Sequence, residues 1–303
     1  MQTILTYSAN TEIARELVTA GRMLGSATAL ALDEAATGDL AATGANVLCF
    51  EGAGVIPADT AALAKVIALA VHKASATVVL LGSDRRGKEL AGRVAAELDA
   101  GCLSDVKGIS LESDTIVCTR LSYGGATIAT EVVTSPIQVI AVSPMAFEMA
   151  EDGAPGAIST FGGDVVATVA VVGERAKVSE GVDVKAAEVI VAIGEGVEEA
   201  SVAQADKLAQ LLGGVLACSK PTATDRKLLS EERVIGLSGA ITKPNLALVI
   251  GISGQAQFSV GIRDAKTIIS INTDKNAGMN RMSDYFLVED SGKAIAELCE
   301  KLA

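Results

Sequence analysis

The sequence Leu246-Ala-Leu-Val-Ile250, followed by Gly251-Ile-Ser-Gly254, is the stretch that decides the fold of this chain. An uninterrupted apolar run of this length is typical of a parallel strand that is buried on both faces of its sheet. The Gly-x-Ser-Gly segment predicts a turn from this strand into a helix, with free backbone N–H groups that favour a phosphate. On this motif alone, a tight connection that binds nothing stays an open alternative.

The composition indicates an α/β protein of about two domains. Half of the 303 residues are hydrophobic but only 3% are aromatic, so the cores are built from alanine, valine, isoleucine and leucine. This suits stacked strand–helix units better than a β-sandwich. The net charge is −12 and no basic stripe is interleaved with aromatic residues, so we expect no nucleic-acid partner.

The histidine and cysteine content limits the chemistry that the chain can perform. The single histidine, His72, falls in the last turn of a predicted helix over 60–74, where the helix dipole favours a cation. Histidine-dependent hydrolysis and histidine-rich metal sites are therefore poor candidates. Five cysteines are scattered without any Cys-x-x-Cys pair, which favours reduced thiols in the core over disulfides or a metal site.

The sequence predicts neither a secretory leader nor a membrane span. The first residues lack a basic flank and a cleavage site, and no apolar run approaches the roughly 18 residues that a membrane helix needs. We therefore expect a cytoplasmic protein with no membrane insertion.

The segment from Gly82 to Glu89 almost matches the phosphate-binding loop of nucleotide hydrolases. Its spacing is Gly-x-x-x-x-Gly-Lys, but Glu89 stands where that loop needs a hydroxyl for Mg²⁺. A carboxylate at this place would repel the phosphates. The segment is expected to be an ordinary turn between a strand and a helix.

Alternating and continuous apolar runs predict two domains, residues 1–182 and 183–303. The first is an α/β domain with a mostly parallel sheet to which an antiparallel edge is appended, and residues 151–163 are expected to be a loop. The second is a doubly wound parallel sheet. The boundary is expected at Ser179–Asp183. Strands are expected near 2–8, 26–32, 46–51, 77–82, 115–122, 127–134, 137–142, 165–172, 188–193, 214–218, 234–236, 246–250, 266–272 and 285–288, and helices near 10–24, 60–74, 88–98, 197–212 and 291–302.

Polar side chains follow several strands of the second domain, where doubly wound sheets bind ligands. Ser219 and Lys220 follow one strand, Ser238 another, and Asn272 with Asp274 a further one. Together with the Gly251–Gly254 turn they predict a site for an extended phosphorylated ligand.

The order of these motifs resembles the alpha subunit of electron transfer flavoproteins. The segments that carry the resemblance in the second domain follow the family order: Ala217-Cys-Ser-Lys-Pro221, Gly236-Leu-Ser-Gly239, Pro244-Asn-Leu-Ala247, Gly251 to Ile262, Ile271-Asn-Thr-Asp274 and Ser283-Asp-Tyr285. In the first domain, Gly82 to Val106 and Arg120 to Thr130 follow the family pattern. These stretches cover about two-thirds of the chain, and they absorb the near-match at Gly82–Glu89 as a family turn.

The resemblance implies that the second domain binds FAD. The residues implied near the pyrophosphate, the phosphoribityl region and the adenine end are Gly251, Ile252, Ser253, Gly254, Gln257, Asn272, Asp284 and Tyr285. Those implied near the flavin ring are Ser219, Lys220, Leu237, Ser238, Gly239 and Phe258. Three ring positions depart from the family: Lys220 replaces an arginine, Leu237 a glutamine and Phe258 a histidine.

The resemblance also implies the function and the partners. The chain would be an electron carrier rather than an enzyme with its own substrate, paired with a beta subunit that its first domain contacts. It would shuttle electrons from soluble dehydrogenases to an acceptor such as a quinone oxidoreductase. Membership of a larger oxidoreductase or of a bifurcating complex stays open. The three departures leave one alternative, a flavin- or nucleotide-binding module of this fold that has lost or altered its redox function.

Overall fold

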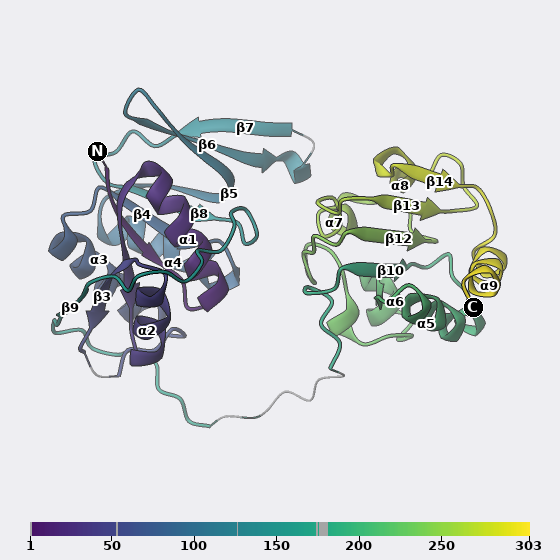
Figure 1. Ribbon diagram of the computed structural model, residues 1–303, viewed down its shortest axis with the longest axis horizontal. Coiled ribbons are helices and arrows are strands. Elements are labelled where there is room, and N and C mark those ends of the chain that lie inside the picture. The colour runs from purple at the N-terminus through teal and green to yellow at the C-terminus, as the bar shows by residue number, and fades with distance from the viewer. Residues whose placement is uncertain (1, 53, 126, 174, 176–180) are drawn as a thin grey trace. The chain divides into compact units, whose positions relative to one another are not determined.

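The computed structural model describes residues 2–52, 54–125, 127–173, 175 and 181–303. The chain forms two compact units, Met1–Glu174 and Arg175–Ala303, each with its own sheet (Figure 1). This division falls eight residues before the boundary expected at 182/183, and part of the segment Ser179–Asp183 lies outside the described residues.

The amino-terminal unit contains a nine-stranded sheet in the order β7-β6-β5-β8-β4-β1-β2-β3-β9. Its strands are β1 Gln2–Tyr7, β2 Gly25–Ala31, β3 Asn46–Phe50, β4 Val78–Gly82, β5 Gly101–Glu112, β6 Thr115–Ser122, β7 Thr127–Val132, β8 Gln138–Val142 and β9 Ile158–Phe161. Only the pairs β5–β6 and β6–β7 are antiparallel, so the prediction of a parallel sheet with an antiparallel extension is confirmed. The strand order reverses between β1 and β4, which neighbour each other in the sheet.

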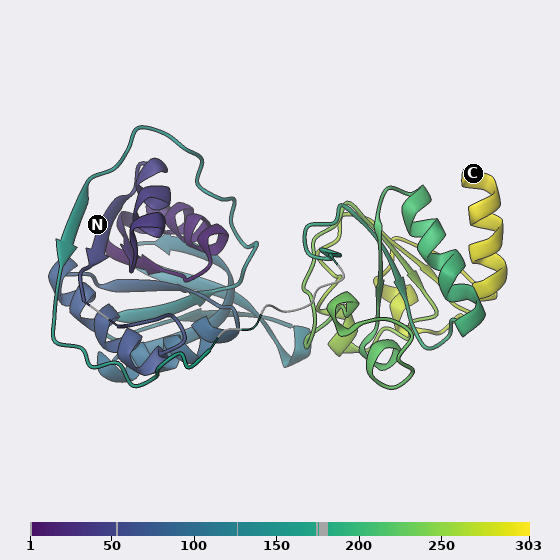
Figure 2. The same cartoon turned by 90° about the horizontal axis from the view of Figure 1, so that it is seen from below.

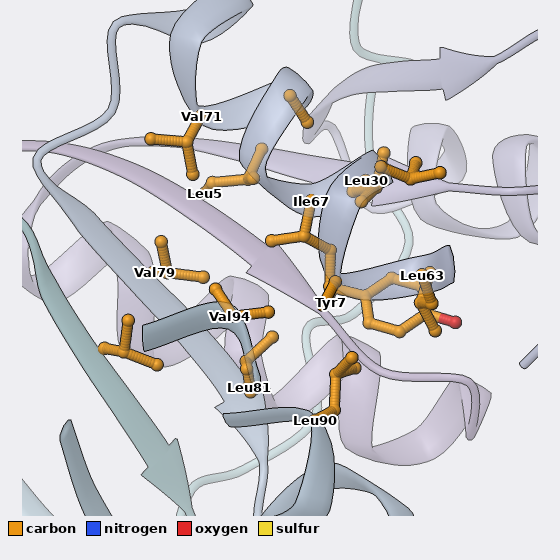
Figure 3. Packing of buried hydrophobic residues seen from close by; sticks show 14 of the residues in the cluster. Leu5, Tyr7, Leu30, Leu63, Ile67, Val71, Val79, Leu81, Leu90 and Val94 are labelled. Atoms are coloured by element: carbon orange, nitrogen blue, oxygen red, sulfur yellow. The ribbon is translucent and has the colours of Figure 1, made fainter. Parts of the chain in front are cut away.

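Four helices cover the two faces of this sheet: α1 Thr11–Leu24, α2 Glu34–Ala42, α3 Thr60–Ala74 and α4 Arg85–Glu97. Side chains of α3 and α4, such as Ile67 and Val94, pack with Leu5 and Leu81 of the sheet in one apolar cluster (Figure 3). On the opposite face, α1 places Leu17 against other side chains of β1 and β4. The helix α2 was not expected from the sequence. Its residues are small, only Thr37, Leu40 and Ala41 are buried, and they form no long apolar stripe.

Two expectations near the end of this unit were wrong. Residues 165–172 form no strand, and Val166 and Val172 are among the most exposed apolar side chains. The last edge strand is β9 instead, inside the stretch expected to be a loop, and it pairs with β3 in parallel. Three of the four residues of β9 are exposed, so this edge strand shows little apolar periodicity in the sequence. Residues 165–172 are apolar but have no neighbouring strand to pair with, so they form no strand.

The segment between β4 and α4 is a strand-to-helix turn, as expected. Asp84 caps α4 by accepting a hydrogen bond from the N–H of Gly87 at 2.7 Å, so this amide is not free for a phosphate. Lys88 forms an ion pair with Asp105 at 2.7 Å. A side chain at Gly87 would come within 1.7 Å of the carbonyl oxygen of Gly82, which explains Gly87 as a position of close backbone approach. At Gly82, a Cβ atom would instead stand 2.7 Å from the side chain of Ile13.

The carboxyl-terminal unit contains a five-stranded parallel sheet in the order β11-β10-β12-β13-β14. The strands are β10 Val189–Ile193, β11 Val215–Cys218, β12 Leu246–Ile250, β13 Ile268–Ile271 and β14 Tyr285–Leu287, and the helices are α5 Val202–Leu211, α6 Lys220–Thr224, α7 Ala256–Ser259, α8 Gly278–Met282 and α9 Ser291–Leu302. The strand expected over 234–236 was wrong, because these residues form only isolated bridges, such as Val234 with Cys218.

The two faces of this second sheet are covered differently. The helices α5 and α9 lie side by side on one face and bury Leu208 and Ile295 there (Figures 1 and 2). The other face is covered by irregular segments and the short helices α7 and α8, which bury Phe258 and Met279. The chain winds from β10 to β11 on one side and returns to β12 on the other, so its switch point lies between β10 and β12.

The cysteines differ from one another in exposure. Cys118, Cys218 and Cys299 are buried thiols, as expected, but Cys102 on β5 is exposed and Cys49 is half-buried. No helix in the described part of the chain is long and apolar enough to span a membrane.

Candidate functional site

The turn after β12 lies at the switch point of the carboxyl-terminal sheet, where doubly wound sheets bind ligands. Gly251 follows β12 directly, and its carbonyl accepts a hydrogen bond from the N–H of Gly196 at 3.0 Å. This bond joins the turn after β10 to the turn after β12. The turns that follow the neighbouring strands β10 and β12 are therefore hydrogen-bonded to each other.

A run of backbone N–H groups around this turn has no acceptor in the described part of the chain. Gly251 donates to the carbonyl of Ile271, but among the described residues none accepts a hydrogen bond from the N–H of residues 252–257. Backbone N–H groups in folded proteins almost always find a partner. Six consecutive free donors on a Gly/Ser turn form a cradle that an anion with several oxygens can fill.

The two glycines of the turn are required by close backbone packing. Gly254 has a φ of +84°, and a Cβ atom there would stand 2.1 Å from the backbone nitrogen of Met279. Met279 in turn donates its N–H to the carbonyl of Ser253 at 3.1 Å. Gly251 has a φ of +64° and packs against Gly196. The start of α8 therefore holds the turn from one side and the turn after β10 from the other, while Ser253 stays exposed.

The loop Gly236–Gly239 is tied to the same segment. Leu237 donates its backbone N–H to the carbonyl of Gln257 at 2.7 Å, and a Cβ atom at Gly236 would clash with that carbonyl. Leu237, Ser238 and Gly239 are exposed, and 69% of the Leu237 side chain is accessible. The structure thus brings this loop beside Gln257, with the side chains of Leu237 and Ser238 exposed.

Ser219 and Lys220 follow β11, at the same edge of the sheet. Ser219 is buried and its hydroxyl shares a hydrogen bond of 3.0 Å with the hydroxyl of the fully buried Thr222. Lys220 is exposed, and its side chain forms no hydrogen bond or ion pair with a described residue. The ammonium group is thus available, whereas the serine is held in place by a threonine that the sequence analysis did not identify.

Asn272 follows β13, the neighbour of β12. Its side-chain nitrogen donates to the carbonyl of Ile252 at 3.0 Å, and its side-chain oxygen accepts from the N–H of Asp274 at 3.0 Å. Asn272 therefore fastens the Gly251–Gly254 turn to the next strand end. Ile252 itself is buried below the turn.

Phe258 is 6% exposed and belongs to the apolar cluster on the inner face of the turn, together with Ile235 and Met279. Phe258 lies in α7, and its ring anchors this short helix in the cluster. The departure from histidine at this position is thus accompanied by a fully apolar setting.

Asp284 and Tyr285 stand apart from the other candidates. Asp284 pairs through its backbone and its carboxylate with Ile268, the first residue of β13, at 2.9 and 2.8 Å. Asn272 lies beyond the other end of β13, four residues or about 13 Å of extended chain away. Tyr285 begins the edge strand β14 and is 66% exposed. The two residues thus lie at the amino edge of the sheet, opposite to the turn.

Some residues that shape this site were not recognised from the sequence. Gly196 and Met279 contact the Gly251–Gly254 turn from segments that lie far from it along the chain, whereas Thr222 lies three residues from Ser219. The available signal for Gly196 was the Gly-Glu-Gly triplet directly after a buried strand. No local pattern identifies Met279, because its contact comes from the tertiary fold.

Comparison with known proteins gives matches over both units. Residues 8–170 match the family model of the electron transfer flavoprotein domain, and residues 183–263 match that of the electron transfer flavoprotein FAD-binding domain. Protein FixB of Salmonella paratyphi A is 36% identical over 229 residues, which are 74% of this chain and 73% of that protein. Protein FixB of Escherichia coli O127:H6 is 34% identical over 230 residues, 75% and 74% of the two chains.

Proposed function

Because this chain belongs to the alpha-subunit family of electron transfer flavoproteins, we propose that it binds FAD at the carboxyl edge of its second sheet and carries electrons between soluble oxidoreductases. That the chain is an electron transfer flavoprotein subunit follows from both family matches and from the FixB relatives. The proposal concerns three further points: that the flavin is FAD, which residues hold it, and which proteins are the partners.

The observation that carries the proposal is the run of N–H groups at residues 252–257 without a protein acceptor. The pyrophosphate of FAD presents several charged oxygens, and hydrogen bonds to charged groups are stronger than those between neutral groups. Ser253 adds an exposed hydroxyl to this set of donors. The donor chemistry of this turn therefore suits a dinucleotide phosphate.

The ring end of the cofactor is assigned to the loops on the β11 and 236–239 sides of the edge. Ser238 and the exposed part of Leu237 would lie against the ring, and Lys220 would supply positive charge. The hydrogen bond between Ser219 and Thr222 would fix the start of α6, and with it the backbone of Lys220. Gln257 and Asn272 would keep the turn and the loops in register through the bonds that they already make.

The flavin supplies the redox chemistry when it is bound, and the protein supplies placement and electrostatics. Lys220 would compensate negative charge on the cofactor, and the donors at 252–257 would hold the phosphates at the sheet edge. The described part of the site lacks a histidine, so proton transfer by an imidazole of this chain has no place in the proposal. The chain is thus proposed as a carrier without a substrate of its own.

The test removes one N–H donor from the turn. Gln255 has a φ of −63°, which proline adopts without strain, and its side chain is exposed. We expect Gln255→Pro to weaken FAD binding by about ten- to a hundredfold, the loss of one charge-assisted hydrogen bond. Gln255→Ala is the matched control, because it removes the side chain but keeps the N–H. Equal FAD affinity of the two variants, measured by fluorescence titration and with the flavin identified by chromatography, would refute the cradle.

The proposed partner is a beta subunit that contacts the amino-terminal unit. The antiparallel extension carries exposed apolar side chains, with Tyr123 89%, Ile128 72% and Val132 46% accessible. Exposed apolar patches of this kind mark interaction sites. On co-expression with a beta subunit, Ile128→Lys should abolish a 1:1 complex in size-exclusion chromatography. Met23→Lys, which changes another exposed apolar residue on α1, should leave it intact.

A further inference from the structure

Two carbonyl groups of the turn after β12 are held by the segment that follows β13. The carbonyl of Ile252 accepts a hydrogen bond from the side-chain nitrogen of Asn272 at 3.0 Å, and that of Ser253 accepts one from the N–H of Met279 at 3.1 Å. In a planar trans peptide the carbonyl and the following N–H point in opposite directions. The segment after β13 therefore directs the N–H groups of Ser253 and Gly254 away from itself.

Residues 273–276, which lie between these two contacts, have little apolar packing of their own. Their four side chains are exposed. The hydrogen bonds within this loop are local, since the carbonyl and the carboxylate of Asp274 accept from the N–H groups of Ala277 and Asn276 at 3.1 and 2.8 Å. Exposed loops with few buried contacts are the parts of a protein that open most easily. The loop can hold the turn in one geometry only if a further group fixes it.

Asn280 fixes this loop from the interior of the unit. It is only 7% exposed, and its side-chain nitrogen donates to the carbonyls of Asp274 and Lys275 at 3.1 and 3.2 Å. Its side-chain oxygen accepts a hydrogen bond from the hydroxyl of Ser270 at 2.7 Å. Ser270 lies on β13 and is 1% exposed, so the amide joins the exposed loop to the buried centre of the sheet.

The residues around this amide are otherwise apolar. The adjacent Met279 and Ile268 of β13 belong to the buried apolar cluster on this face of the sheet. Burying an amide costs free energy that an apolar side chain would not cost. A buried polar network whose hydrogen bonds are all made does, however, specify a single arrangement of the chain. The three hydrogen bonds of Asn280 therefore indicate a role in fixing geometry rather than in filling space.

We propose that Asn280 is a positioning residue of the flavin site, an inference that rests on the proposed function. By fixing residues 273–276 it keeps the two donors of this segment in place, and these keep the N–H groups of Ser253 and Gly254 aimed before the cofactor binds. A preorganised site avoids the entropy cost of ordering its groups during binding. Loss of the amide donor therefore weakens FAD binding although the buried side chain itself is not part of the N–H cradle.

The variant Asn280→Asp tests this role through the pH dependence of FAD binding in the full chain. Its ionised carboxylate still accepts from Ser270, but it donates nothing and faces the carbonyl oxygens of Asp274 and Lys275. When protonated, it donates to one of these oxygens. Burial raises the pKa of such a carboxyl group. We therefore expect the FAD affinity of the variant to fall about tenfold between about pH 5 and pH 8, and that of the parent to change less than about twofold.

Two further variants separate positioning from stability. Asn280→Leu places an apolar side chain of similar size in the cluster, and we expect it to weaken FAD binding about tenfold at every pH. Leu208→Ala opens a cavity under α5 on the opposite face of the same sheet. This control should lower the melting temperature and leave FAD affinity unchanged. Fluorescence titration with FAD measures the affinity of each protein, and thermal unfolding measures its stability.

Three results would overturn the role of Asn280 while FAD binding by the parent stands. These are a pH-independent FAD affinity of Asn280→Asp, an unchanged affinity of Asn280→Leu, and a loss of affinity in Leu208→Ala as large as in Asn280→Leu. In the last case the effect would follow stability alone. Failure of the parent to bind FAD would overturn the proposed function, and with it this role.

Discussion

Each α-helix described in the amino-terminal unit begins with a side chain that caps it, whereas four of the five α-helices described in the carboxyl-terminal unit begin without such a cap. Asn10, Asp59 and Asp84 each accept a hydrogen bond from the first turn of α1, α3 or α4. No side chain does this for α6, α7 or α8. The capped helices α1, α3 and α4 have 13 to 15 residues, and the uncapped helices α6, α7 and α8 have 4 or 5. The uncapped α5 has 10 residues, and α9, which Asp290 caps, has 12.

This contrast shows that helices that follow parallel strands can either stabilise their own unit or leave N–H groups available for a ligand. A capped helix satisfies its own N–H groups and adds to the stability of the unit without a ligand. The uncapped turn keeps its N–H groups for an external acceptor, so its stability is linked to ligand binding. The amino-terminal unit is therefore expected to fold independently of FAD, and the carboxyl-terminal unit is expected to gain stability from it.

The largest expected effect comes from filling the space at Gly254. Gly254→Ala combines a φ of +84° with a Cβ atom 2.1 Å from the nitrogen of Met279, so we expect a loss of about 3 kcal/mol or more in the free energy of unfolding. Gly213→Ala is the control, since Gly213 has a φ of +68° but no atom within 4 Å of the new Cβ. That variant should lose only about 1 kcal/mol. Chemical denaturation of both variants measures the difference, and equal losses would show that α8 does not hold the turn.

An intermediate effect is expected from the cap of α3. Asp59 accepts hydrogen bonds from the hydroxyl of Thr168, from the N–H of Ala62 and from the N–H groups of Thr168 and Val169, which together lower its pKa from 3.8 to about 2. Since the folded state holds the charged form, this contribution to stability is complete above about pH 4 and is lost as the pH falls towards 2.

The variant Asp59→Asn tests this cap, because an amide cannot be protonated in this range. We expect the variant to be less stable at neutral pH and to lose less stability between pH 4 and 2 than the parent. Asp33→Asn, which changes the cap of α2 with its single N–H partner, is the control. Thermal unfolding of both proteins is followed over this pH range. If the melting temperature fell with decreasing pH equally steeply for the parent and for Asp59→Asn, the assignment would be wrong.

The smallest expected effect concerns the charge beside the flavin site. Lys220→Gln should leave the fold unchanged, because Lys220 is exposed and has no partner among the described residues, and it should weaken FAD binding by about fivefold. Lys207→Gln removes an exposed lysine from α5 and should not change FAD affinity. Equilibrium dialysis at low and high salt separates the two, because an exposed charge contact is screened by salt. Equal affinities would place the ring away from β11.

Strongly periodic segments could be predicted from the sequence because local rules decide them. The apolar run Leu246–Ile250 and the amphipathic stretch Ser291–Leu302 have the bounds that were expected. The turn Gly251–Gly254 was identified because glycine permits positive φ and close backbone approach. Residues 158–161 and 165–172 show the limit, since an exposed edge strand and an unpaired apolar run differ only in whether a partner strand is within reach.

The sequence by itself determined most strands of the two α/β units, the turn that carries the candidate phosphate site, and the polar residues that follow the strands. Only the tertiary structure decided that Asp284 lies at the opposite edge from Asn272, that Gly196 binds the carbonyl of Gly251, and that Phe258 packs in a buried cluster with Ile235 and Met279. The physical reason is range. Strand and turn formation depend on neighbouring residues, but the partner of a side chain depends on which distant segments the fold places beside it.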